Sequence, residues 1–472
     1  MITRRDILLS LAATAPSSGA TPTDLHWLSI AEAANLLRRR AVSPVDLTQA
    51  CLRRVEALNP RLNAFITLTA DTALTDARKA EKEIRTGRPR SPLHGIPIAL
   101  KDLYDTAGVL TTAASAHYAR RIPTEDAEVV RRLKSAGAII LGKLNMDEFA
   151  YNFTSETSSF GASRNPWDPA RSPGGSSGGS AIAVATGMCF AALGSDTGGS
   201  IRLPASLCGI AGLKPTYGLV DAQGVVPLAW SLDHVGPMCR TARDTATVLS
   251  VLAGRTIAIP PRPAKTLRTG IPKGPWLQGI DTEVRTAFDA AVKLLGGSME
   301  VDLPAHPRSQ AIPDLPQTYI TIIQTEAFAF HEEMVRQHPE RYHAGTLQSI
   351  RNGSAIPAAE YARARREMDR LRMAVRTVFE RVDLLLTPTA QAAAFELGKP
   401  APLTYLRNTA PWNLFGLPTI SIPCGFTKGG LPVGLQITGA PGRDDLVVQL
   451  AGAYQQASKW HLQRPPDAQS RR

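Results

Sequence analysis

Residues 172–187, SPGGSSGGSAIAVATG, place a cluster of glycines and serines directly before a run of small residues. Such a cluster is typical of a flexible linker, of a phosphate-binding loop at a helix N-terminus, or of a catalytic loop that uses backbone N–H groups and hydroxyls. A linker should lead into a new domain, whereas this cluster runs straight into AIAVATG, which favours a closely packed helix. The phosphate-binding motif G-x-x-x-x-G-K-[ST] is not matched, because Gly142 and Lys143 are followed by Leu144. The cluster therefore favours catalysis.

Two serine loops could carry that catalysis. Residues 174–178, GGSSG, formally match the G-x-S-x-G nucleophile elbow, but that elbow must follow a strand, and here NPWDPARSP with its prolines precedes it. Residues 194–202, GSDTGGSIR, do follow a predicted strand at 190–193. Their glycines let successive backbone N–H groups approach a developing negative charge ahead of Ser200. This second loop is the better candidate for an oxyanion hole.

The base that would activate a serine is not a histidine, because none lies near either loop in the sequence. The candidate is Lys101, which directly follows the apolar run IPIAL in the segment GIPIALKD, residues 95–102. Burial disfavours an ammonium group and lowers the pKa of a lysine, so a neutral amine base becomes possible. Without the two serine loops, a lysine at a strand end would be an ordinary surface residue.

Around these segments the pattern predicts helices first and then alternating strands and helices. Helices are expected at 29–37, 43–59, 70–85, 125–136 and 181–186, and strands at 96–100, 138–141, 190–193, 384–386, 419–422 and 433–437. The alternation predicts an α/β fold with a large mixed sheet covered by helices on both faces. We expect residues 21–472 to form a single domain, in which residues 255–380 are a variable helical insertion or cap.

Composition limits the partners and cofactors. The chain has 472 residues, 43% hydrophobic and 20% charged, and a net charge of +12. Its arginines and lysines are dispersed, and those at 363–376 alternate with acidic residues, which is typical of a solvated helix face rather than a nucleic-acid surface. Five scattered cysteines, without C-x-x-C spacing, indicate neither a disulfide framework nor a zinc site. We expect no nucleic-acid partner, metal or cofactor.

Residues 1–20, MITRRDILLSLAATAPSSGA, join the pair Arg4-Arg5 to a short apolar run. This pattern resembles a twin-arginine export signal, with small residues before Thr21 as a cleavage site. The run is too short to span a bilayer, so we expect no stable membrane insertion. The signal predicts a periplasmic or secreted protein, and the alternative is an uncleaved N-terminal helix in a cytoplasmic protein.

Three segments together resemble the amidase signature family of serine hydrolases. They are GIPIALKD around Lys101, SPGGSSGGSAIAVATG around Ser176, and LGSDTGGSIRLPASLCGIAGLKPTYG around Ser200. In this sequence 75 positions separate Lys101 from Ser176 and 24 separate Ser176 from Ser200, as the family requires. Further matches are NMDEFAY, FGASRNPWD, SLDHVGPM, DLLLTPT and NLFGLPTISIPCG. The resemblance runs from about residue 27 to 458 and is weakest between 255 and 380.

The resemblance implies an amidase that hydrolyses the C–N bond of a small carboxamide. Ser200 is expected to attack the carbonyl, while Ser176 relays its proton to neutral Lys101. The oxyanion would be held by the backbone N–H groups of Thr197, Gly198, Gly199 and Ser200. The family also implies a cis peptide bond between Gly175 and Ser176.

The substrate is less well defined by the sequence. Phe153, Thr154, Trp412 and Phe415 are expected to line an apolar or aromatic pocket, although core packing would also explain them. One family branch is the glutamine-hydrolysing subunit of a tRNA-dependent amidotransferase, in which an acidic residue holds the amine of the amino acid. Leu406 occupies that position here. An esterase and a non-catalytic binding module on the same fold remain alternatives, and we expect a monomer or homodimer that works without a partner protein.

Overall fold

The computed structural model describes residues 25–260, 263–305 and 315–466. Within these residues the strands form one 11-stranded sheet in the order β1-β3-β2-β4-β6-β5-β10-β11-β9-β7-β8. The strands are β1 Phe65–Leu68, β2 Pro97–Lys101, β3 Ile139–Leu144, β4 Ala191–Asp196, β5 Ala211–Lys214, β6 His234–Cys239, β7 Thr269–Pro272, β8 Met299–Val301, β9 Leu384–Pro388, β10 Thr419–Phe426 and β11 Pro432–Gly439. The expected mixed α/β sheet is confirmed.

Strand direction decides where the catalytic segments meet. β2 is parallel to both β3 and β4, whereas the successive pairs from β4 through β6, β5, β10 and β11 to β9 are all antiparallel. β2 ends at Lys101 and β4 ends at Asp196. Because the carboxyl ends of adjacent parallel strands meet at one edge of a sheet, the residues that follow these two strands are brought together.

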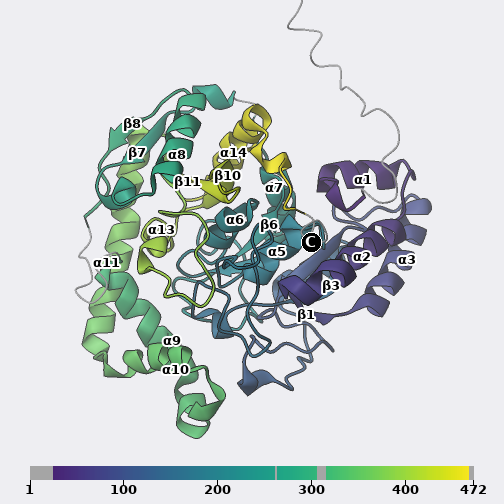
Figure 1. The fold of residues 1–472 in the computed structure, drawn as a ribbon, viewed down its shortest axis with the longest axis horizontal. Coiled ribbons are helices and arrows are strands. Elements are labelled where there is room, and N and C mark those ends of the chain that lie inside the picture. Colours follow the sequence, from purple (N-terminus) through teal and green to yellow (C-terminus); the bar gives the residue numbers. More distant parts are fainter. Residues whose placement is uncertain (1–24, 261–262, 306–314, 467–472) are drawn as a thin grey trace, which may run out of the picture.

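Helices pack against the sheet along its length: α3 against β3, α5 against β2 and β4, and both α6 and α14 against β10 and β11. Figure 1 shows α1–α3 at one end of the molecule and α9–α11 at the other. The helices are α1 Ile30–Arg38, α2 Pro44–Leu62, α3 Ala70–Arg85, α4 Glu128–Ser135, α5 Gly178–Ala185, α6 Arg202–Cys208, α7 Ala242–Leu252, α8 Thr282–Leu294, α9 Gln317–Gln337, α10 Ala344–Arg351, α11 Ala358–Ala374, α12 Val378–Arg381, α13 Ala410–Phe415 and α14 Asp444–Ser458. The capping boxes at Ser29 and Ser43 start α1 and α2 as predicted.

The segment 255–380 differs from the expected helical insertion. It supplies α8–α11, but also β7 and β8, and β7 pairs in parallel with β9. The segment therefore extends the sheet as well as adding helices. Its strands are four and three residues long and two positions of β8 are exposed, so neither gives a buried apolar run.

Other features bear on the remaining predictions. All five cysteines are free and buried. In the described ranges no helix has the length and apolarity to cross a bilayer. The predicted export signal at residues 1–20 lies outside the described residues.

Candidate active site

Lys101 lies at the end of β2 with no exposed surface. Its Nζ donates hydrogen bonds to Ser176 Oγ at 2.7 Å and to Ser195 Oγ at 2.9 Å. Burial lowers the pKa of Lys101 to about 7, an effect that three nearby aspartates oppose. Near neutral pH a large fraction of this amine is therefore uncharged and can accept a proton.

Ser176 lies in the glycine-rich segment immediately before α5, and the Gly175–Ser176 peptide bond is cis. Gly175 cannot be replaced without movement, because an added Cβ would lie 2.2 Å from Asp147 Oδ2. The loop is thus packed tightly against a buried carboxylate, which fixes the hydroxyl of Ser176 next to Lys101. This close packing explains the glycines of the 172–187 segment.

The loop that carries Ser200 is built around a buried ion pair. Asp196 and Arg202 have no exposed side-chain surface, and Arg202 Nη2 lies 2.8 Å from Asp196 Oδ1. The carboxylate of Asp196 also accepts the N–H groups of Gly199 at 2.8 Å and Ile201 at 3.1 Å. Burial alone would raise the pKa of Asp196, but Arg202 holds it below its usual range. The pair therefore braces the loop as a structural element.

This bracing corrects one part of the predicted oxyanion hole. The Gly199 N–H donates to Asp196, so it is not available to a substrate oxygen. In the described part of the chain no protein acceptor is bonded to the N–H groups of Thr197, Gly198 or Ser200. Three of the four predicted donors are thus free to bind an oxyanion.

The two serine loops adjoin, since the Ser177 N–H donates to the Ser200 carbonyl oxygen at 3.3 Å. Ser200 is 7% exposed and lines a cavity. Among the described residues no hydrogen bond joins the hydroxyls of Ser200 and Ser176. The hydrogen bond between Ser176 and Lys101 is thus formed in this structure, whereas the one that proton transfer from Ser200 to Ser176 requires is not. Catalytic hydrogen bonds are often long in unliganded enzymes and shorten when substrate binds.

A cavity of about 340 Å³ opens beside Ser200, at the small end of the range for ligand sites. Its walls come from the segment 150–153, the loop that carries Ser200, one face of α9, α10 and the 3₁₀ helix Leu403–Leu406. The lining residues are Ala150, Tyr151, Asn152, Phe153, Thr197, Gly198, Ser200, Leu228, Leu315, Tyr319, Ile320, Ile323, Gln324, Gly345, Ser349, Asn352, Leu403 and Leu406.

The absence of charged side chains is the most informative property of the described cavity lining. No aspartate, glutamate, lysine, arginine or histidine is found among the described residues that line it. Leu406 is part of the wall. The hydrogen-bonding groups that remain are hydroxyls, amides and backbone, so the cavity suits an uncharged ligand with an apolar portion.

Of the four residues predicted to line the pocket, only Phe153 does so. Trp412 is fully buried and stacks on Trp276 with ring centroids 4.7 Å apart, and Phe415 is 2% exposed in the core. Thr154 is 9% exposed and its carbonyl oxygen accepts from Ser172. None of these three lines the cavity, and for Trp412 and Phe415 the reason is that large apolar residues near a site pack in the core as readily as in a pocket.

Sequence reasoning missed the part of the pocket that α9 provides. The hydroxyl of Tyr319 lies over the oxyanion loop, where a Cβ on Gly198 would be 2.1 Å from it. Gly198 is thus required for this close approach. The prediction that residues 255–380 are helical did not indicate which face of α9 would line the active-site cavity.

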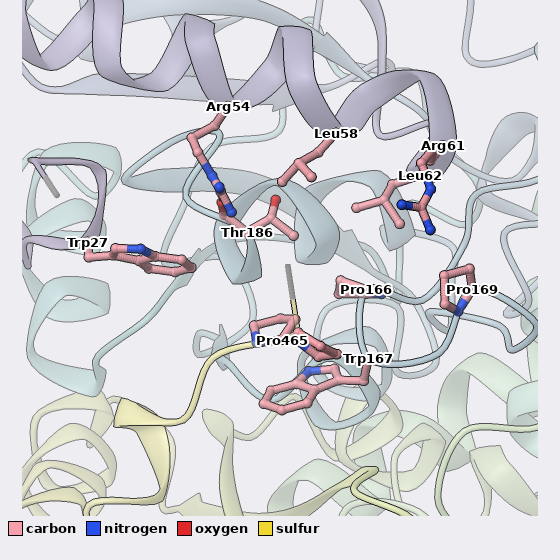
Figure 2. A pocket seen from close by; sticks show the side chains of 11 residues that line it. Trp27, Arg54, Leu58, Arg61, Leu62, Pro166, Trp167, Pro169, Thr186 and Pro465 are labelled. Carbon is pink, nitrogen blue, oxygen red and sulfur yellow. The ribbon is translucent and has the colours of Figure 1, made fainter. Parts of the chain in front are cut away.

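A second hollow lies between α2, the loop 166–169 and the C-terminal segment (Figure 2). Its volume is about 40 Å³, enough for very few water molecules. Trp27, Trp167 and Pro465 line it, and Lys101, Ser176 and Ser200 do not. The cavity beside Ser200 is therefore the candidate active site. No group of three or more His, Cys, Asp or Glu side chains in the described ranges could hold a metal ion.

Comparison with known proteins agrees with this geometry. The family model "Amidase" matches residues 46–448. A glutamyl-tRNA(Gln) amidotransferase subunit from Chloroflexus aurantiacus is 40% identical over 487 aligned positions, covering 94% of this chain and 99% of that protein.

Solved structures give the same picture. A crystal structure of an amidase superposes with a TM-score of 0.84 at 35% identity, covering 91% of this chain and 99% of that one. A glutamyl-tRNA(Gln) amidotransferase subunit from Thermotoga maritima superposes with a TM-score of 0.76 at 34% identity, covering 92% and 96%.

Proposed function

This chain belongs to the amidase family and is a hydrolase of amide C–N bonds, and we propose that its substrate is an uncharged carboxamide attacked by Ser200. The observation that supports this substrate class is the cavity beside Ser200, whose described lining carries no charged side chain. A free amino acid brings an ammonium and a carboxylate, and burying either without a partner is costly. A neutral amide with an apolar acyl group avoids that cost.

In the proposed reaction the Ser200 oxygen bonds to the amide carbon while Ser176 accepts the Ser200 proton and passes its own to Lys101. The carbonyl oxygen becomes an oxyanion that accepts from the N–H groups of Thr197, Gly198 and Ser200. Its collapse breaks the C–N bond, and a proton returned through Ser176 leaves with the amine. Water then attacks the acyl-enzyme through the same relay, which releases the carboxylic acid and restores Ser200.

The test is a substrate panel with purified protein and no added partner. Hexanamide and benzamide should be hydrolysed with a higher kcat/KM than free L-glutamine, and Ser200→Ala should abolish turnover and labelling by a fluorophosphonate probe. Matched amide and ester pairs would reveal an esterase, for which only the ester is cleaved. Labelling without turnover of any amide or ester would contradict the proposal.

Leu406 offers a sharper version of this test. Leu406→Asp should lower kcat/KM for hexanamide at least about tenfold, because it introduces a charge into the wall that an apolar group contacts. Leu406→Met is the matched control and should change it little, since the volume is conserved. A gain of glutamine hydrolysis in Leu406→Asp alone would identify this position as the determinant of substrate charge.

The second candidate is the glutamine-hydrolysing component of a tRNA-dependent amidotransferase, and the curated relative at 40% identity over almost the whole chain favours it. On sequence comparison alone this candidate has the better support. It requires a partner protein that receives ammonia and a pocket that holds glutamine. Hydrolysis of glutamine only, or only after that partner protein is added, would decide for it.

Export through residues 1–20 is also proposed, from the Arg4-Arg5 pair and the apolar run that follows. Replacing both arginines by lysine should retain the precursor in the cytoplasm. Mature protein that begins at Met1 in the native cell would contradict export and would remove one objection to the second candidate.

A further inference from the structure

The carboxylate of Asp233 connects two walls of the active site. Its Oδ1 accepts a hydrogen bond from Thr197 Oγ1 at 2.6 Å. Its Oδ2 accepts from the backbone N–H groups of Leu228 at 2.9 Å and Ala229 at 3.1 Å. Three donors converge on one acceptor-only group, so each has a fixed position relative to the others.

The residues joined in this way are not remote from the chemistry. Thr197 and Leu228 both line the cavity that contains Ser200. Thr197 also supplies one of the N–H groups free to bind an oxyanion. Asp233 thus holds the oxyanion loop against the wall that the substrate contacts.

The same segment has a second acidic anchor. Glu326, fully buried on α9, accepts from the Ser231 N–H at 2.9 Å, from the Ser231 hydroxyl, and from the Tyr361 hydroxyl at 2.8 Å. α9 is the helix whose Tyr319, Ile320 and Ile323 face the cavity. Residues 228–233 therefore form a tether, with α9 attached at Ser231 and the oxyanion loop attached at Asp233.

We propose that Asp233 is a positioning residue for this reaction. By fixing Thr197, it keeps the N–H groups of the oxyanion loop in the orientation that binds the oxyanion and at a constant position relative to Leu228 in the cavity wall. The inference rests on the proposed acyl transfer at Ser200. Donors that are held in place before the reaction cost no reorganisation when charge develops, and this preorganisation is a large part of catalysis at such sites. Removing the Thr197–Asp233 bond should loosen the donors without altering the apolar contacts that bind substrate.

The experiment compares Thr197→Val, Asp233→Asn and the double variant with the wild type. Each single variant should lower kcat about 10-fold to 100-fold, somewhat less than loss of a whole oxyanion donor, with KM changed less than about threefold. The double variant should lose little more than Asp233→Asn alone, because the Thr197 hydroxyl then has no carboxylate to hold it. Thr197→Ser, which keeps the hydroxyl, should restore most of kcat.

A matched control exists elsewhere in the fold. Thr216 Oγ1 donates to Asp444 Oδ2 at 2.6 Å, a second threonine–carboxylate pair whose two residues do not line the cavity beside Ser200. Thr216→Val should reduce thermal stability as Thr197→Val does, but leave kcat within about twofold. Equal losses of kcat in both, or none in Thr197→Val, would overturn the proposal.

The rate of Ser200 phosphonylation by a fluorophosphonate gives a second readout that does not depend on the substrate class. It should fall in Thr197→Val and recover in Thr197→Ser even if no neutral amide is turned over, so failure of the proposed function and failure of this inference are distinguishable. If Asp233→Asn does not fold, Thr197→Val decides alone, since it keeps the carboxylate and its two backbone donors. Additive losses in a folded double variant would also refute the coupling.

Discussion

Two buried lysines on neighbouring strands have opposite surroundings. Leu100 and Lys101 of β2 pair with Lys143 and Leu144 of β3, and neither lysine has exposed surface. Within the described ranges, Lys101 Nζ forms hydrogen bonds with two serine hydroxyls and with no carbonyl or carboxylate. Lys143 Nζ donates to the Tyr104 carbonyl at 2.6 Å and to the Thr111 hydroxyl at 2.7 Å, and lies 3.5 Å from Asp102 Oδ1.

The difference lies in what the partners can do. A carbonyl and a carboxylate can only accept, so they favour the ammonium form, whereas hydroxyls can also donate to the lone pair of a neutral amine. Burial lowers the pKa of Lys101 to about 7, where three aspartates oppose the fall, and that of Lys143 to about 8, where Asp102 opposes it. Burial alone does not make a base, and the choice of partners decides which lysine can act as one.

The strongest test of this contrast is the removal of each amine. Lys101→Met should lower kcat/KM by about 10³-fold or more, because the base acts as a unit with Ser176 and Ser200. The variant should remain folded, since it replaces a buried amine by an apolar group of similar size. Steady-state kinetics with a circular dichroism melt measures both. Near-wild-type turnover at neutral pH would contradict the assigned role.

Lys143→Met should have the reverse phenotype. It leaves the Asp102 carboxylate buried without its counter-charge, which should cost about 3–5 kcal/mol of unfolding free energy. Urea denaturation measures this loss, and turnover per folded molecule should stay within a few-fold of wild type. If the kcat of Lys143→Met fell as far as that of Lys101→Met, the two lysines could not be separated into catalytic and structural roles.

The smallest effect is the pH dependence. A base with a pKa of about 7 is protonated below that pH, so kcat/KM should rise about tenfold per pH unit up to pH 7 and level off above it. In Lys143→Met the rise of kcat/KM up to pH 7 should be unchanged, because Lys143 does not take part in the reaction. A rate that stayed flat from pH 5 to pH 8, with chemistry rate-limiting, would argue against a neutral lysine base.

The three residues proposed for catalysis could be predicted from the sequence, because they lie in short motifs with fixed spacing and two of these motifs are rich in glycine. Lys101, Ser176 and Ser200 are brought to one edge of the sheet as expected. The hydrogen bond from Gly199 to Asp196 could not be foreseen, since sequence does not show which way an N–H points. Tyr319 and Asp233 were missed because they reach the site through tertiary packing.

The strands also fall into those that the sequence predicted and those that it did not. Buried apolar runs such as β2, β3, β10 and β11 were predicted near their observed positions. The strands that were not predicted are β1, β5, β6, β7 and β8. Most of these are three or four residues long, and β1 has an exposed terminal residue, so a local pattern gives too few positions to define a period. Their pairing partners, distant in the chain, supply what their own sequence lacks.

The five free cysteines can serve as natural probes of local unfolding. Each thiol is buried and has a raised pKa, so almost no thiolate meets an alkylating reagent while the fold is closed. Cys51 lies on α2, Cys239 ends β6 and Cys424 lies on β10. Iodoacetamide modification followed by mass spectrometry would therefore follow the exposure of each of these three elements, without any engineered label.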